Sequence, residues 1–171
     1  IFNLIFDIFK KKNKFSTPRI LLIADKPNWA YDSIAKCIVK YNKSDLIIDI
    51  DYIKKPKKKL KNNHKNYDLI FILGWQLLAH IENNKLIEDI TYINKNKILT
   101  GIHSHHSWDN RKTLPNFDIE PPKDLINFLN TIKGVNCVSK KLYNIFSKAG
   151  LDKIFLTENG VDSEIFIQKY N

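Results

Sequence analysis

Hydrophobic residues along the chain form short continuous runs that alternate with segments of helical spacing. Runs such as RILLIA and DLIFILGW carry almost no polar residues, which is typical of strands buried on both faces of a sheet. The run from Leu46 to Ile53 instead alternates apolar and acidic residues, which favours a strand nearer the sheet edge. We therefore expect strands over residues 19–24, 46–53, 68–75, 98–102, 135–138 and 154–157.

Between these runs, apolar residues recur at steps of three and four, which predicts amphipathic helices. Such spacing occurs from Ala30 to Tyr41 and in a helix that Asp124 caps, and Gly150 ends a further helix that begins at Lys140. A helix is also expected to start at Gln76. Residues 1–17 read as a separate amphipathic helix followed by a basic linker.

Six alternations of strand and helix indicate an α/β fold, a Rossmann-like, doubly wound parallel sheet formed by residues 18–171. We expect about six strands in the order 3-2-1-4-5-6. That order places the ends of the first and fourth strands side by side, so the loop at Asp25 faces His103. Ligands of such sheets bind beyond the carboxyl ends of the strands, which makes this edge the place to look for a site.

The net charge of +10 is concentrated in two stretches, the lysines of residues 10–14 and those of residues 54–65. Asn and Pro surround the second stretch, and it contains neither Arg nor an aromatic residue. This composition is typical of a solvated loop or of a patch facing an anionic membrane surface, and it argues against a base-reading nucleic-acid surface. The lysines in question are Lys54, Lys55, Lys57, Lys58, Lys59 and Lys61.

Several function classes lack their motifs. The loop after the first strand, DKPNWAYD, contains no glycine, which argues against a dinucleotide site, and no phosphate-binding P-loop or serine-hydrolase elbow is present. Cys37 and Cys137 stand far apart and are read as buried thiols, which favours a cytoplasmic protein. No apolar run approaches the roughly 20 residues of a membrane span.

Candidate chemistry gathers after two strands. His103, His105 and His106 follow the fourth strand, and although a His-x-His pair can chelate zinc, polar loop histidines are commoner and we predict no metal. Other candidates for substrate contact lie near strand ends, each with a structural alternative: an aromatic ring can fill the core, and an acidic residue can support a helix start. These candidates are Asp25, Trp29, Asp32 and Trp75.

The last quarter of the chain carries a recognisable pattern. Val138-Ser139 precedes a helix ending at Ala149-Gly150, a strand follows, and then comes the block Asn159-Gly160-Val161-Asp162 with Phe166. This pattern resembles the end of the amino-terminal domain in GT-B retaining glycosyltransferases of the group 1, family 4-like type. Thr100 to His103 looks like that family's strand-end histidine, and the loop from Asp25 to Asp32 looks like that of bacterial surface-polysaccharide members. The resemblance covers residues 19–166.

The resemblance implies a two-domain hexosyltransferase that moves a sugar from a nucleotide-sugar donor to a glycan or lipid-linked acceptor without a metal or other cofactor. The amino-terminal domain then holds the acceptor, and His103 contacts the transferred sugar and aids the transition state by hydrogen bonding. The strand-end block borders the interdomain hinge and supplies Asn159, Gly160 and Asp162.

Three departures from the family pattern limit these expectations. Glu158 stands where the family has proline, the first loop lacks the family's glycines, and the chain stops where the donor-binding domain should begin. Residues 1–171 are thus expected to be inactive without that domain. The alternative is a non-catalytic α/β binding module that holds an anionic partner through its lysine runs. For the glycosyltransferase we expect a cytoplasmic location, peripheral at the inner membrane face through the same lysines.

Overall fold

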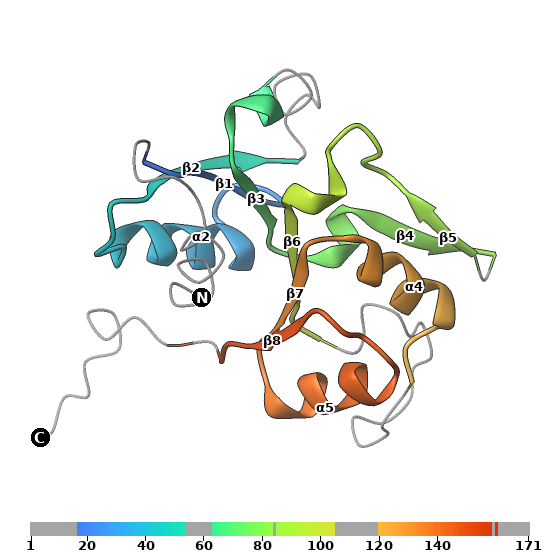
Figure 1. The fold of residues 1–171 in the computed structure, drawn as a ribbon. Coiled ribbons are helices and arrows are strands. Elements are labelled where there is room, and N and C mark those ends of the chain that lie inside the picture. Colours follow the sequence, from blue (N-terminus) through green and yellow to red (C-terminus); the bar gives the residue numbers. More distant parts are fainter. Residues whose placement is uncertain (1–16, 54–62, 84, 105–119, 159, 161–171) are drawn as a thin grey trace, which may run out of the picture.

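The computed structural model describes residues 17–53, 63–83, 85–104, 120–158 and 160. These residues form an α/β fold around a six-stranded parallel sheet with the order β2-β1-β3-β6-β7-β8 (Figure 1). The strands of this sheet are β1 (Arg19–Ala24), β2 (Ile47–Tyr52), β3 (Leu69–Ile72), β6 (Ile98–Ile102), β7 (Gly134–Cys137) and β8 (Ile154–Leu156). The α-helices described are α2 (Ala30–Lys40), α4 (Lys123–Thr131) and α5 (Lys140–Lys148).

The predicted α/β class and the predicted strand positions are confirmed, but the strand order is wrong. The third strand was expected at the sheet edge, whereas β3 lies between β1 and β6, with Ile20 beside Leu69 and Ile70 beside Ile98. All four residues of β3 are buried, and an edge position would have exposed them on one side. The half-exposed strand β2 takes the edge instead, as its alternating pattern predicted.

The helix expected from Gln76 is also wrong. A single 3-10 turn, Trp75–Leu77, leads into an antiparallel hairpin of β4 (Ala79–Glu82) and β5 (Lys85–Glu88). The segments AHIE and KLIE alternate with a period of two, which is the strand period, and Asn83 has the positive φ of 49° that a tight turn requires. The strand period therefore decided the structure of this segment.

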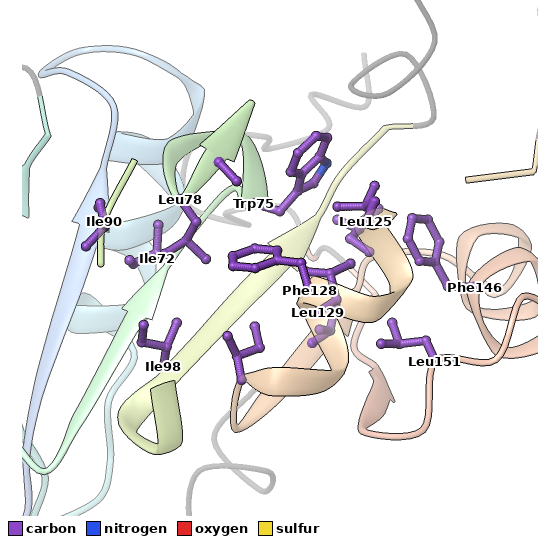
Figure 2. Close-up of a cluster of buried hydrophobic side chains, with 14 of the residues drawn as sticks. Ile72, Trp75, Leu78, Ile90, Ile98, Leu125, Phe128, Leu129, Phe146 and Leu151 are labelled. Atoms are coloured by element: carbon purple, nitrogen blue, oxygen red, sulfur yellow. The ribbon is translucent and has the colours of Figure 1, made fainter. Parts of the chain in front are cut away.

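The sheet buries a hydrophobic cluster on each face. Helix α2 covers one face, where Ala35 and Ile38 pack against residues of β1 and β3. Helices α4 and α5 and the hairpin pack into the cluster on the other face, around β6 and β7 (Figure 1). Figure 2 shows the larger of the two clusters, which contains Trp75, Leu125 and Phe128.

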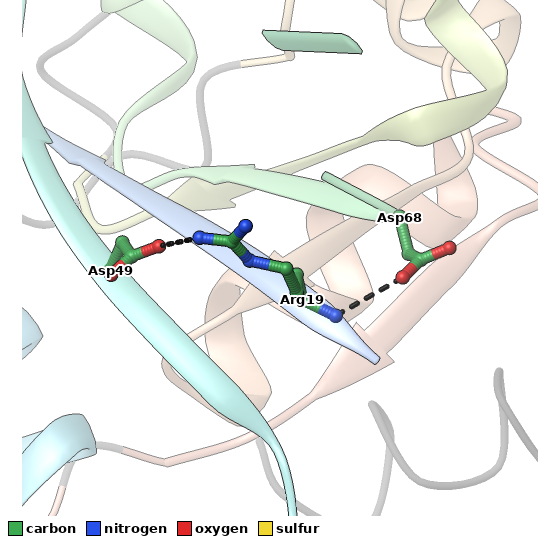
Figure 3. Close-up of polar contacts among 3 residues, drawn as sticks. All are labelled: Arg19, Asp49 and Asp68. Carbon is green, nitrogen blue, oxygen red and sulfur yellow. Dashed lines mark hydrogen bonds and ion pairs between the residues drawn. The ribbon is translucent and has the colours of Figure 1, made fainter. Parts of the chain in front are cut away.

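Charged side chains are paired at the amino-terminal edge of the sheet, which we call the N-terminal rim. The guanidinium of Arg19, at the start of β1, lies 3.1 Å from a carboxylate oxygen of Asp49 on β2. The backbone N–H of Arg19 donates to the carboxylate of Asp68 at 3.1 Å, just before β3 (Figure 3). These contacts tie the amino ends of three neighbouring strands together.

Candidate functional site

The carboxyl ends of β1, β3 and β6 bring candidate chemistry to the opposite edge of the sheet. Asp25 directly follows β1 and His103 directly follows β6. These strands are not neighbours, because β3 lies between them, so the predicted side-by-side placement of the two strand ends is wrong. The link between them is Tyr31, in the first turn of α2.

Tyr31 contacts one residue that follows β3 and one that follows β6. Its Oη accepts a hydrogen bond from Gln76 Nε2 at 2.6 Å, and its ring meets that of His103 edge-on, with centroids 5.0 Å apart and planes at 65°. Burial raises the pKa of Tyr31, the hydrogen bond from Gln76 opposes this shift, and the negative charge of Asp25 adds to it. The hydroxyl therefore stays protonated. We call Asp25, Tyr31, Gln76 and His103 the rim cluster.

Two glycines make room for these side chains. A Cβ atom on Gly74, just beyond β3, would lie 2.5 Å from Tyr31 Oη. A Cβ atom on Gly101, inside β6, would lie 2.5 Å from the carbonyl oxygen of Leu73 and 2.6 Å from His103 Nε2. Real Cβ atoms do not approach other atoms so closely, so Tyr31 and His103 occupy positions that only glycine neighbours permit.

Two polar atoms of the rim cluster are buried and unpartnered. Among the described residues, neither Asp25 Oδ1 nor His103 Nε2 has a hydrogen-bond partner. Burial lowers the pKa of His103, and the nearby carbonyl of Leu73 opposes this shift, so the imidazole is neutral at pH 7. A carboxylate oxygen accepts hydrogen bonds, and a neutral imidazole nitrogen accepts or donates according to its tautomer. This pair suits a ligand with hydroxyl groups.

Trp29 is an exposed aromatic ring at the same edge of the sheet. It precedes α2 and is 55% exposed, and the ammonium of Lys26 lies 3.1 Å from the centre of its ring. Asn28 before it adopts a left-handed φ of 62°, which shapes the loop. Trp29 is thus accessible to a ligand, and stacking on a sugar stays a prediction.

Asp32, by contrast, is used by the fold. Its side chain is 1% exposed and accepts hydrogen bonds from the Asn28 backbone N–H, from Tyr52 Oη and from Lys36 Nζ, each at 2.7 Å. Burial acts to raise the pKa of Asp32, but these three donors outweigh it, and the net shift is downward. This arrangement matches the alternative interpretation, in which Asp32 supports the start of α2. Contact with a substrate would require Asp32 to lose one of these hydrogen bonds.

Trp75 lies inside the larger hydrophobic cluster and is 1% exposed (Figure 2). Its position matches the core-filling alternative. A ligand would reach the ring only if this cluster opened.

Several predicted residues fall outside the part of the chain that the structure describes. This applies to the amino-terminal helix and, one by one, to His105, His106, Asn159, Asp162 and the lysines of residues 54–61. Gly160 is described and exposed, and a Cβ added to it would meet no atom within 4 Å. Within the described residues there is no group of three or more His, Cys, Asp or Glu side chains that could hold a metal ion.

Sequence reasoning missed Tyr31, Gln76 and the two glycines. A glycine inside a fully apolar strand, as at Gly101, is a signal of close approach by another group and would have pointed to this edge. Tyr31 carries no such signal, since its importance arises from contacts with residues more than 40 positions away.

Comparisons with known proteins add no family to this geometry. We find no match to the chain among protein-family models, curated proteins or solved structures. Among the described helices, none combines the length and the apolar character needed to cross a bilayer.

Proposed function

We propose that this chain is the acceptor-side, amino-terminal domain of a GT-B retaining glycosyltransferase. The enzyme transfers a sugar from a nucleotide-sugar donor to a glycan or lipid-linked acceptor. The observation that carries the proposal is the position of His103 at the carboxyl end of a central parallel strand, with Nε2 buried and unpartnered among the described residues. Burial lowers the pKa of His103, which favours the neutral imidazole. The sequence pattern around residues 138–162 supports the same family.

The chemistry of the rim cluster fits this reaction. His103 donates or accepts a hydrogen bond at a hydroxyl of the transferred sugar and stabilises charge that develops in the transition state, without forming a covalent bond. Asp25 accepts a hydrogen bond from a hydroxyl through Oδ1. The donor nucleotide binds to a second domain beyond this chain, so the residues described here orient the sugars.

The test is a screen of nucleotide sugars with the full-length protein, measuring transfer and donor hydrolysis. In the variant His103→Ala we expect a loss on the order of 10²-fold in kcat, as for removal of one transition-state hydrogen bond. The matched control is His80→Ala, because His80 lies on the exposed side of the hairpin strand β4 and contacts Asp89 rather than the rim cluster. Unchanged turnover in folded His103→Ala excludes the role of His103, and the absence of turnover with every donor contradicts the proposal.

The lysine-rich stretch adds a membrane-facing element to the proposal. Strand β2 ends at Tyr52, at the same edge of the sheet as Asp25, and the stretch begins two residues later with Lys54. An anionic bilayer there would present lipid-linked acceptors to the rim cluster. Replacing the six lysines of residues 54–61 should weaken co-sedimentation with anionic liposomes, whereas replacing exposed Lys123 and Lys140 should not. Equal binding by both variants contradicts this element.

A further inference from the structure

The first turn of α2 contributes Tyr31 to the surroundings of His103. His103 lies just beyond the end of β6, where the strand no longer fixes its direction. With Nε2 unpartnered among the described residues, no hydrogen bond at that atom holds the ring in one orientation. Two neighbours contact the ring: the backbone carbonyl of Leu73, whose hydrogen bond acts to raise the pKa of His103, and the ring of Tyr31, which packs edge-on against it.

Tyr31 is itself held from several sides. Gln76 donates a 2.6 Å hydrogen bond to its hydroxyl, from the turn that follows β3. The side chain passes over Gly74, where any Cβ atom would collide with its ring carbons at 2.8 Å. Its backbone belongs to α2, which packs through Ala35 and Ile38 on the sheet. These contacts favour the position in which the Tyr31 ring lies against His103.

We propose that Tyr31 is a positioning residue, whose ring fixes the orientation of the His103 imidazole and whose hydroxyl is in turn held by Gln76. A reacting group must be held to within a fraction of an ångström by packing and by hydrogen bonds of its neighbours. Tyr31 supplies the packing and Gln76 supplies the hydrogen bond. The consequence for sugar transfer rests on the proposed function, whereas the orientation of the ring can be measured without any sugar.

The proposal separates the roles of the ring and the hydroxyl. Tyr31→Phe keeps the edge-on contact with His103 and loses only the bond from Gln76. Tyr31→Leu keeps a hydrophobic side chain and loses the aromatic contact. Gln76→Ala changes an exposed residue and leaves the hydrophobic core intact. The control is Tyr41→Ala, because Tyr41 lies just past the other end of the same helix.

The experiment follows the ring nitrogen and proton signals of His103 in the ¹⁵N-labelled full-length protein from about pH 5 to 8, across which histidine titrates. We expect one set of ring signals in the wild type, with a pKa below the ordinary value. Tyr31→Leu should shift or multiply these signals and move the pKa upward, since the ring that shields the imidazole is gone. Tyr31→Phe and Gln76→Ala should give smaller changes in the same direction, and Tyr41→Ala none.

Sugar transfer supplies the second readout. Misplacement of His103 in Tyr31→Leu should lower kcat by up to about 10²-fold with a smaller effect on KM. If folded Tyr31→Leu and Gln76→Ala both leave the ring signals of His103 unchanged, the positioning role is wrong, whatever the activity. If the signals change but no nucleotide sugar reacts, the positioning role stands and the glycosyltransferase proposal fails.

Discussion

The two edges of the sheet use their polar groups in opposite ways. At the N-terminal rim, Arg19 is paired with Asp49 and Asp68, and Lys97 Nζ donates to the backbone carbonyl of Tyr67 at 2.7 Å. At the carboxyl edge, Asp25 Oδ1 and His103 Nε2 are buried without partners among the described residues. Leaving a buried polar atom without a hydrogen bond costs about 1–3 kcal/mol. Such atoms therefore indicate a place where a bound ligand supplies the missing hydrogen bonds.

The same contrast exists within a single loop and the helix that follows it. Asp25 and Asp32 are seven residues apart, yet Asp32 accepts three hydrogen bonds while one oxygen of Asp25 accepts none. The donors that satisfy Asp32 come partly from Tyr52 on a different strand. Whether a carboxylate stabilises the fold or is left for a ligand therefore depends on the donors that the tertiary structure places around it.

The largest expected effect concerns this pair. Asp32→Ala leaves Tyr52 Oη and the Asn28 N–H without their acceptor and should lower the free energy of unfolding by about 3 kcal/mol. Asp25→Asn changes a side chain whose Oδ1 has no hydrogen-bond partner among the described residues, so it should leave stability within about 0.5 kcal/mol and reduce sugar binding. Urea unfolding of both variants measures this difference, and equal losses would contradict it.

The next largest effect concerns the glycine beside His103. Gly101→Ala places a Cβ atom 2.5 Å from the backbone carbonyl of Leu73, which cannot move without disturbing β3, and should cost about 1–3 kcal/mol. Gly160→Ala is the control, because its Cβ would meet no atom within 4 Å. Thermal unfolding compares the two. A neutral Gly101→Ala variant would mean that the room at this strand end is not required.

A smaller effect is the pH dependence that His103 contributes. Its pKa is lower in the folded state than the ordinary value of 6.5, so the unfolded chain binds more protons at acidic pH. The folded state therefore loses stability as the pH falls below about 6.5. His103→Gln should remove this part of the pH dependence. Urea unfolding at a series of pH values measures it, and parallel curves for the two proteins would show that His103 does not titrate abnormally.

The smallest effect is expected at the N-terminal rim. Arg19 and Asp49 are both substantially exposed, and exposed ion pairs contribute about 0–1 kcal/mol. Arg19→Ala should therefore lower stability by less than about 1 kcal/mol. It should leave sugar transfer unchanged, because in this account the rim cluster binds the sugar and the N-terminal rim only stabilises the fold. A large loss of transfer in this variant would show that the N-terminal rim is not purely structural.

The sequence predicted the strands well because each strand carries its own hydrophobic pattern. Strand β1 matches its predicted range, and β6 ends where His103 was expected to follow. The order of the strands depends instead on how completely each strand is buried. The fully apolar β3 lies in the centre of the sheet, whereas the predicted order placed it at the edge. The hairpin β4–β5 was missed because its short strand period was read as the start of a helix.

The candidate site was predictable only in part. His103 and Asp25 stand at strand ends that periodicity locates, so the sequence was enough to single them out. Tyr31 and Gln76 were not identified, since their contacts join α2 to the segment after β3 across 45 residues of sequence. Trp75 follows a buried strand just as His103 does, and only its burial in the larger hydrophobic cluster shows that its ring belongs to the core.

The most direct test is a titration of the labelled full-length protein with nucleotide sugars and oligosaccharides, followed by side-chain NMR of the rim cluster and of the N-terminal rim. We expect the ring signals of His103 and Tyr31 to shift with saturation on adding a sugar ligand, while the guanidinium signal of Arg19 stays in place. Saturable shifts at Arg19 with none at His103 would contradict the assignment of binding to the carboxyl edge of the sheet.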